Sequence, residues 1–179
     1  MKTSVNKYKV TPSPVENSSI RFKSTLRAVK KYGIEHPSLD ADMPNMFGSA
    51  IGVKETLSKH IDLNRHWSRA NYQTITSFEV LEHLQNPLLY LTCIYNHLYY
   101  GGKLFLTTPV KWMLKGKYHF HEFTKEELIF CLIKAGFNAE QIKITRIQAY
   151  ALRHFGIRPL IRKVRDMIYG QCFFVIAMK

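Results

Sequence analysis

Three titratable side chains lie close together in the stretch SFEVLEHLQNP, residues 77–87. Glu79, Glu82 and His83 follow an apolar, β-branched run, and Asn86-Pro87 then forms a pair typical of a helix start. A carboxylate at such a junction can contact a ligand, and the imidazole of His83 titrates near neutral pH and can act as a general base. The same acids also suit the amino end of a helix, where its dipole favours negative charge. Both interpretations stay open at this point.

A second group of titratable residues lies in the stretch HFHE, which contains His119 and His121. On a strand, this spacing places two imidazoles on one side, as in some metal sites. No third ligand has a suitable spacing, so we expect no bound metal. Surface structure is the simpler alternative for these two histidines.

These residues need elements that position them, and strands alternate with helices for most of the chain. β-Branched and aromatic runs predict strands near 38–41, 74–80, 103–108, 140–148 and 171–178. Helices are expected from Ser19 to Lys31, after the Asn86 cap, and after a capping box formed by Thr124 and Glu127. The alternation predicts a three-layer α/β/α sandwich, with a Rossmann-like, mostly parallel sheet and an antiparallel edge strand.

Ligands of such a sheet bind outside the carboxyl ends of its strands. Asp40 lies at the end of the first predicted strand, Glu79 and Thr108 lie at the ends of later ones, and Glu82 and His83 follow the strand that contains Glu79. We therefore expect these side chains at the ligand-binding edge. Asp40 is equally compatible with a turn or a helix cap.

Length and composition predict one globular unit. The chain has 179 residues, of which 46% are hydrophobic, and we expect a flexible basic arm over 1–18 and a domain over 19–179. The three cysteines form an odd number without metal spacing, which favours reduced thiols. The polar amino terminus carries no secretion signal, and no apolar run is long enough to span a bilayer, so a cytoplasmic location is expected.

Basic residues exceed acidic ones, 26 against 13, which gives a net charge of +13. Residues 153–165 concentrate this excess, and the stretch RPLIRKVRDMI, residues 158–168, is predicted to form a basic amphipathic helix. The pattern favours contact with an anionic lipid surface or with nucleic acid. A solvated helix face without a partner is the alternative.

An ordered set of motifs resembles the class I S-adenosylmethionine-dependent methyltransferases. It runs through FEVLEHLQNPLLYL, LYYGGKLFLTTP and HFHEFTKEELIFCLIKAGF, from about Thr74 to Phe137, and the final CFFVIAMK is similar to the family's last strand. The resemblance implies methyl transfer from S-adenosylmethionine to an unidentified acceptor, which is either a small molecule or membrane-associated. The oligomeric state is left open.

The resemblance also implies roles for individual residues. It places the cofactor against Asp40, Asp42, Asn45, Asp62, Phe78 and Glu79. It places catalytic groups on the acceptor side, namely Glu82, His83, His119 and His121. Asp62 is also compatible with an ordinary turn.

The first motif departs from the family pattern. The family has glycines after the first strand, whereas this chain has Ala41, Asp42, Met43 and Pro44. Glycines there allow close backbone approach, so we expect looser cofactor contacts. A methyltransferase-like binding module without turnover is therefore the alternative function.

Overall fold

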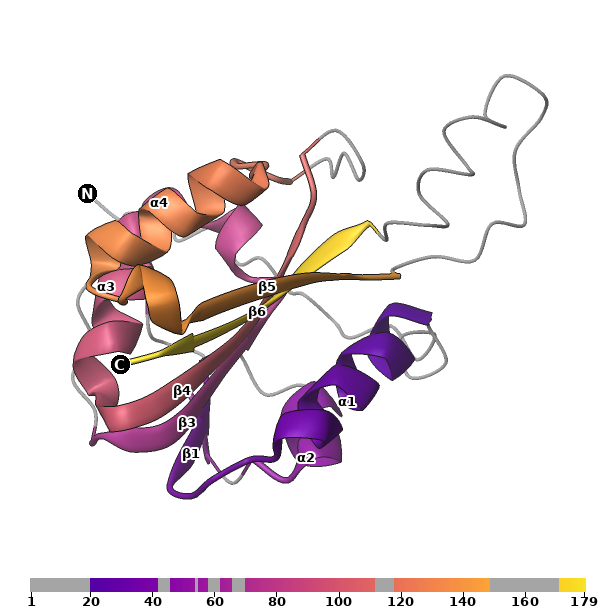
Figure 1. The fold of residues 1–179 in the computed structure, drawn as a ribbon, viewed down its shortest axis with the longest axis vertical. Coiled ribbons are helices and arrows are strands. Elements are labelled where there is room, and N and C mark those ends of the chain that lie inside the picture. Colours follow the sequence, from indigo (N-terminus) through magenta and orange to yellow (C-terminus); the bar gives the residue numbers. More distant parts are fainter. Residues whose placement is uncertain are drawn as a thin grey trace, which may run out of the picture.

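The computed structural model of the chain describes residues 20–41, 46–53, 55–57, 62–65, 70–111, 118–148 and 171–179. Within these residues, six strands form one sheet in the order β2-β1-β3-β4-β6-β5 (Figure 1). The strands are β1 (Ser38–Asp40), β2 (Glu55–Thr56), β3 (Tyr72–Phe78), β4 (Leu98–Pro109), β5 (Ile142–Ile147) and β6 (Cys172–Met178). The predicted basic helix at 158–168 and the arm at 1–18 lie outside the described residues.

The sheet is mixed, as predicted. Strands β2, β1, β3 and β4 run parallel, β6 pairs antiparallel with β4, and β5 pairs antiparallel with β6. The antiparallel strand β6 therefore lies between β4 and β5, and β5 forms the edge of the sheet. Because β3 lies between β1 and β4, its carboxyl end is central in the sheet.

Helices cover both faces of the sheet, which confirms the predicted three layers. Figure 1 shows α1 (Ile20–Tyr32) and α2 (Met46–Ile51) on one face, and α3 (Pro87–His97) and α4 (Lys125–Ala135) on the other. No helix in the described part of the chain is both long enough and apolar enough to cross a membrane.

Alternating strand residues separate the core into two clusters. Leu104 and Leu106 of β4 pack with residues of α3 and α4, including Ile94 and Leu132. Phe105, between them in sequence, packs on the α1 side in a cluster with Val29, Phe78, Phe174 and Ile176. This division follows from the period of two in a strand, which turns neighbouring side chains to opposite faces.

The predicted helix signals are confirmed in the structure. The Asn86 side chain accepts a hydrogen bond from the backbone N–H of Leu89, and Pro87 takes the first helical position of α3. Thr124 and Glu127 form a reciprocal capping box at α4, and Gly136 ends that helix with a φ of 119°.

The observed element boundaries differ most from the expectation around β3 and at the junction of α3 with β4. Helix α3 ends at His97, and β4 begins directly at Leu98, so the pair Gly101-Gly102 lies inside the strand. Strand β3 covers 72–78 in place of 74–80, because Glu79 turns into the left-handed region and a 3₁₀-helix, η2 (Leu81–His83), follows. The acids after β3 therefore occupy a tight turn that precedes α3.

Candidate functional site

The carboxyl ends of β1 and β3 meet where the strand order reverses. From β1 the chain proceeds to β2 on one side, whereas β3 pairs with β1 on the other. Parallel α/β sheets bind ligands outside such a switch point. Asp40 ends β1 at this place and Glu79 directly follows β3, which brings these two predicted residues to the same edge.

The Asp40 carboxylate is buried beneath α2. Its Oδ1 accepts a hydrogen bond from the Thr76 hydroxyl at 2.7 Å. Gly48 of α2 packs so closely that an added Cβ would lie 2.8 Å from Asp40 Oδ2. The absence of a side chain at Gly48 therefore lets α2 cover this end of β1. Sequence reasoning gave Gly48 no role.

Glu79 has an unusual backbone and a partly satisfied carboxylate. Its φ of 58° is rare for a residue with a side chain, and its N–H donates to Thr107 O at 3.0 Å. Arg21 of α1 donates to Glu79 Oε2 at 2.8 Å. Among the described residues, neither Glu79 Oε1 nor Thr107 Oγ1 has a hydrogen-bond partner, although both atoms are buried. Such orphaned polar atoms are uncommon and often mark functional sites.

The thiol of Cys172 borders the same acid. Burial, and secondarily the Glu79 carboxylate, raises the pKa of the Cys172 thiol far above its ordinary value. The residue therefore stays protonated near neutral pH and cannot serve as a thiolate nucleophile. All three cysteines are free, in line with the expected reduced thiols.

Glu82 lies on the other side of this turn and is almost completely buried. The Thr108 hydroxyl donates to Glu82 Oε2 at 3.1 Å. Burial raises the pKa of Glu82 well above 4.5, and the nearby Glu79 carboxylate raises it further. The Glu82 carbonyl accepts hydrogen bonds from the backbone N–H groups of Phe120 and His121, at 2.8 and 3.2 Å. These bonds attach the HFHE segment to η2.

That attachment brings two of the predicted histidines together. The rings of His83 and His119 are 5.0 Å apart between centroids, in an edge-to-face arrangement. His83 Nε2 lies 4.0 Å from Glu82 Oε1, and its Nδ1 lies 3.0 Å from Tyr118 O. Glu82, His83 and His119 thus form one cluster.

The His121 ring makes a ring contact outside this cluster. Its imidazole stacks on Phe123 with 5.9 Å between ring centroids. It lines an open depression whose other walls include Lys111, Glu122, Phe130 and Cys131. The structure therefore separates His121 from His119, although only one residue lies between them.

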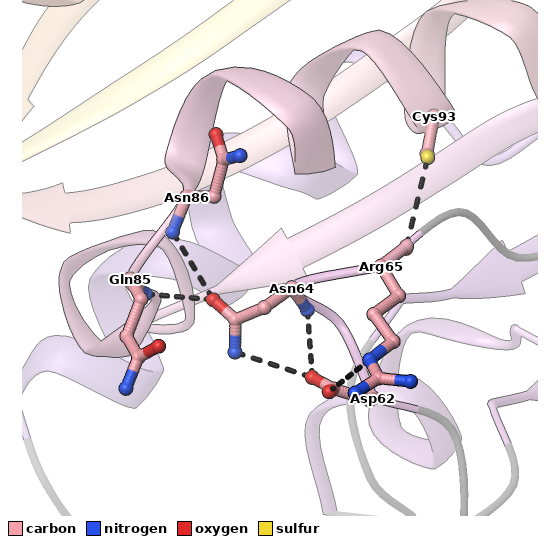
Figure 2. Close-up of polar contacts among 6 residues, drawn as sticks. All are labelled: Asp62, Asn64, Arg65, Gln85, Asn86 and Cys93. Atoms are coloured by element: carbon pink, nitrogen blue, oxygen red, sulfur yellow. Dashed lines mark hydrogen bonds and ion pairs between the residues drawn. The ribbon is translucent and has the colours of Figure 1, made fainter.

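Asp62 forms a turn that docks on the start of α3 (Figure 2). Its Oδ1 accepts a hydrogen bond from the Asn64 N–H at 2.9 Å, and its Oδ2 pairs with Arg65 at 3.2 Å. Asn64 Oδ1 in turn accepts from the N–H groups of Gln85 and Asn86, at 2.7 and 3.1 Å. The described contacts of Asp62 are those of an ordinary turn, and its role toward the cofactor stays a prediction.

The remaining predicted cofactor residues fall in two places. Phe78 is buried in the core beneath α1. Asp42 and Asn45 lie outside the described residues. Arg21 was not predicted, since it lies 58 positions before its partner Glu79 and no local pattern marks the pair.

Comparison with known proteins supports a single family. A family model described as a methyltransferase domain matches residues 20–142, which is more than half of the chain. No curated protein matches the sequence. Many solved structures share the fold.

Three of these structures show how far the likeness extends. A SAM-dependent methyltransferase from Thermotoga maritima has a TM-score of 0.67 at 15% identity, covering 89% of each chain. One from Archaeoglobus fulgidus has a TM-score of 0.59 at 15% identity, covering 88% of this chain and 94% of the other. Phosphoethanolamine N-methyltransferase 2 from Haemonchus contortus, in complex with S-adenosyl-L-methionine, has a TM-score of 0.59 at 13% identity, covering 86% and 52%.

Proposed function

The chain belongs to the class I S-adenosylmethionine-dependent methyltransferase family, and from this premise we propose that it transfers a methyl group from S-adenosylmethionine to a small-molecule acceptor. The observation that carries the proposal is the match of residues 20–142 to the methyltransferase domain. The acidic edge at the ends of β1 and β3 supports it, because this is the switch point of the sheet.

The residues at this edge fit a bound cofactor. Glu79 Oε1 and Thr107 Oγ1 are buried without a partner among the described residues, so a ligand with hydrogen-bond donors would satisfy them. Gly48 allows α2 to approach the edge closely. When bound, S-adenosylmethionine supplies an electrophilic methyl group on its sulfonium. Glu79 and Arg21 would hold it and fix its position, and the buried Asp40, bonded to Thr76, would support β1 and β3 at this edge.

The acceptor side lies on the opposite side of the turn after β3. Glu82, His83 and His119 gather there, and His121 lines the neighbouring open depression. In this proposal these four residues orient the acceptor and exclude water from it. A positioned acceptor needs less ordering before transfer, and this can lower the activation free energy by several kcal/mol.

Calorimetric titration with S-adenosylhomocysteine, the demethylated product, tests the cofactor site. We expect binding that weakens about ten- to a hundredfold in Glu79→Gln, because one charge-assisted hydrogen bond is worth roughly 1.5–3 kcal/mol. Glu140→Gln, an exposed acid in the short 3₁₀-helix before β5, should bind like the wild type. The absence of both binding heat and a thermal shift at about millimolar ligand would overturn the proposal.

Transfer itself requires an acceptor, so a panel should be assayed with methyl-labelled S-adenosylmethionine. Amines, carboxylic acids and phenols represent the acceptor classes. The stretch Ala41-Asp42-Met43-Pro44 lacks the family's glycines and favours the second candidate, a module that binds the cofactor without turnover. Binding of the product together with no transfer to any member of the panel would support that candidate.

A further inference from the structure

We propose that Glu82, His83 and His119 bind a divalent transition-metal ion of the zinc class. One ligand atom from each residue lies within 4.8 Å of the other two. The residues come from η2 and from the HFHE segment, which are distant in the chain. Neither segment alone carries a set of three ligands at metal-site spacing, so only the folded chain assembles this group.

Glu82 is held as a metal-binding carboxylate would be. Its Oε2 accepts the Thr108 hydroxyl at 3.1 Å, and its Oε1 lies 4.0 Å from His83 Nε2. Because the hydroxyl fixes one oxygen, the other is directed to the space between Glu82 and the imidazole. In metal sites, ligating carboxylates are themselves hydrogen-bonded in this way.

His83 has the tautomer that ligation requires. A backbone carbonyl only accepts hydrogen bonds, so the 3.0 Å contact between His83 Nδ1 and Tyr118 O places the proton on Nδ1. The neutral ring then has its lone pair on Nε2, the atom that faces Glu82. Metal-ligating histidines commonly donate their second N–H to a backbone carbonyl or carboxylate, which fixes the ring.

The backbone fixes the third ligand. The N–H groups of Phe120 and His121 both donate to the Glu82 carbonyl. The residue before them, His119, is thereby held beside η2, with its ring 5.0 Å from that of His83. Two imidazoles and a carboxylate thus come together through hydrogen bonds that do not use the ligand atoms themselves.

The donor set selects the class of ion. Two imidazole nitrogens and one carboxylate oxygen suit Zn²⁺ and its first-row neighbours, whereas Mg²⁺ and Ca²⁺ prefer oxygen ligands. Donors around a tetrahedral zinc ion lie roughly 3.3–3.5 Å apart, so these atoms, which are at most 4.8 Å apart, must close by up to about 1.5 Å. The His83 side chain is 45% exposed and has room to move. Three protein ligands would leave a coordination position open for water or a ligand oxygen.

As metal ligands, three of the four residues assigned to the acceptor side of the proposed methyltransferase gain a defined role. Binding of the ion does not depend on methyl transfer. The two proposals can therefore fail separately, provided that product binding and metal binding are measured on the same samples.

Titration of the full chain, without an affinity tag, with Zn²⁺ against a chromophoric chelator tests the site. We expect one ion per chain, and an affinity that falls by at least the ~10–100-fold typical of a lost outer-shell partner in His83→Ala, His119→Ala and Glu82→Gln. Thr108→Val, which removes only the supporting hydroxyl, should weaken binding by about tenfold. Co²⁺ should give the visible spectrum of a nitrogen- and oxygen-ligated site.

The matched control is His121→Ala, which removes an imidazole from the same segment but outside the cluster. Its Zn²⁺ affinity should equal that of the wild type. Equal loss in His121→Ala and His119→Ala would overturn the ligand set, as would Zn²⁺ binding that all three ligand variants retain. Circular dichroism and S-adenosylhomocysteine titration of each variant show whether it is folded. Product binding without zinc binding by the wild type would defeat only the metal site.

Discussion

Among single residues, Glu79 combines a strained backbone conformation with a buried carboxylate oxygen that has no hydrogen-bond partner among the described residues. Its left-handed conformation costs a residue with a Cβ roughly 1–2 kcal/mol, while its carboxylate pairs with Arg21. Residues in such conformations cluster at ligand sites because the surrounding structure maintains them there. A glycine would adopt this backbone conformation at lower cost. We therefore infer that this position requires the carboxylate of Glu79.

Because the backbone at Glu79 is strained, we expect Glu79→Gly to be more stable than Glu79→Ala, which is the reverse of the usual order. Glu79→Ala and Glu79→Gly both lose the contact to Arg21, but only alanine retains the left-handed penalty. We expect the glycine variant to be more stable by about 1 kcal/mol in urea unfolding. The same pair at Thr92, inside α3, should show the usual order, with alanine more stable. An alanine variant at position 79 as stable as the glycine one would contradict the strain.

Gly48 allows a second prediction at this scale. The methyl group of Gly48→Ala would lie 2.8 Å from Asp40 Oδ2, and Asp40 is held by Thr76. Overpacking of this kind costs about 1–3 kcal/mol, so denaturant unfolding should show that loss and product affinity should fall. Ser49→Ala, at the exposed neighbouring position, should leave both unchanged. Unaltered stability of Gly48→Ala would mean that α2 can shift away from β1.

At the scale of elements, the start of α4 depends on the charge of one residue. The hydrogen bond from Lys111, and then that from the Thr124 N–H, lower the pKa of Glu127. The folded state thus favours the ionised carboxylate. Its stabilisation is present above the pKa of the unfolded chain and is lost as the pH falls through the folded value.

Glu127→Gln should therefore destabilise the protein only where the carboxylate is charged. We expect a loss of about 0.5–1 kcal/mol in the free energy of unfolding at pH 7, since the pair is exposed. The loss should be smaller near pH 3, which is below the ordinary glutamate value of about 4.3, because the stabilisation falls as the pH approaches the lowered folded pKa. Urea unfolding at both pH values measures this, with the exposed neighbour Glu126→Gln as control. An equal loss at both pH values would refute the charge-dependent cap.

At the scale of the whole molecule, the net charge of +13 predicts contact with anionic surfaces. Binding to acidic vesicles or to nucleic acid should be measurable at about 20 mM salt and weaken strongly near 0.15 M, where the screening length is about 8 Å. Uncharged vesicles are the control. Replacing Arg158, Arg162 and Arg165 by glutamine should reduce binding most if residues 153–165 make the contact. Binding to neither surface at low salt would leave these residues a solvated helix face.

Features that depend on neighbouring residues could be predicted from the amino-acid sequence. The Asn86-Pro87 start of α3 and the capping box of α4 could be predicted because a cap and its partner lie within one helical turn. The buried strands were recognisable from β-branched and aromatic runs. The ordered motifs between Thr74 and Phe137 predicted the family, and therefore which ends of the sheet would carry the acids.

Contacts between segments that are distant in the chain became apparent only in the folded protein. The insertion of β6 between β4 and β5, the pairing of Arg21 with Glu79, and the attachment of His119 to Glu82 and His83 all join residues far apart in the chain. No local propensity encodes such contacts, because they result from burying apolar faces and satisfying backbone groups across the whole fold. For this reason the sequence predicted separate acids and histidines, whereas the folded chain places three of them within reach of one metal ion.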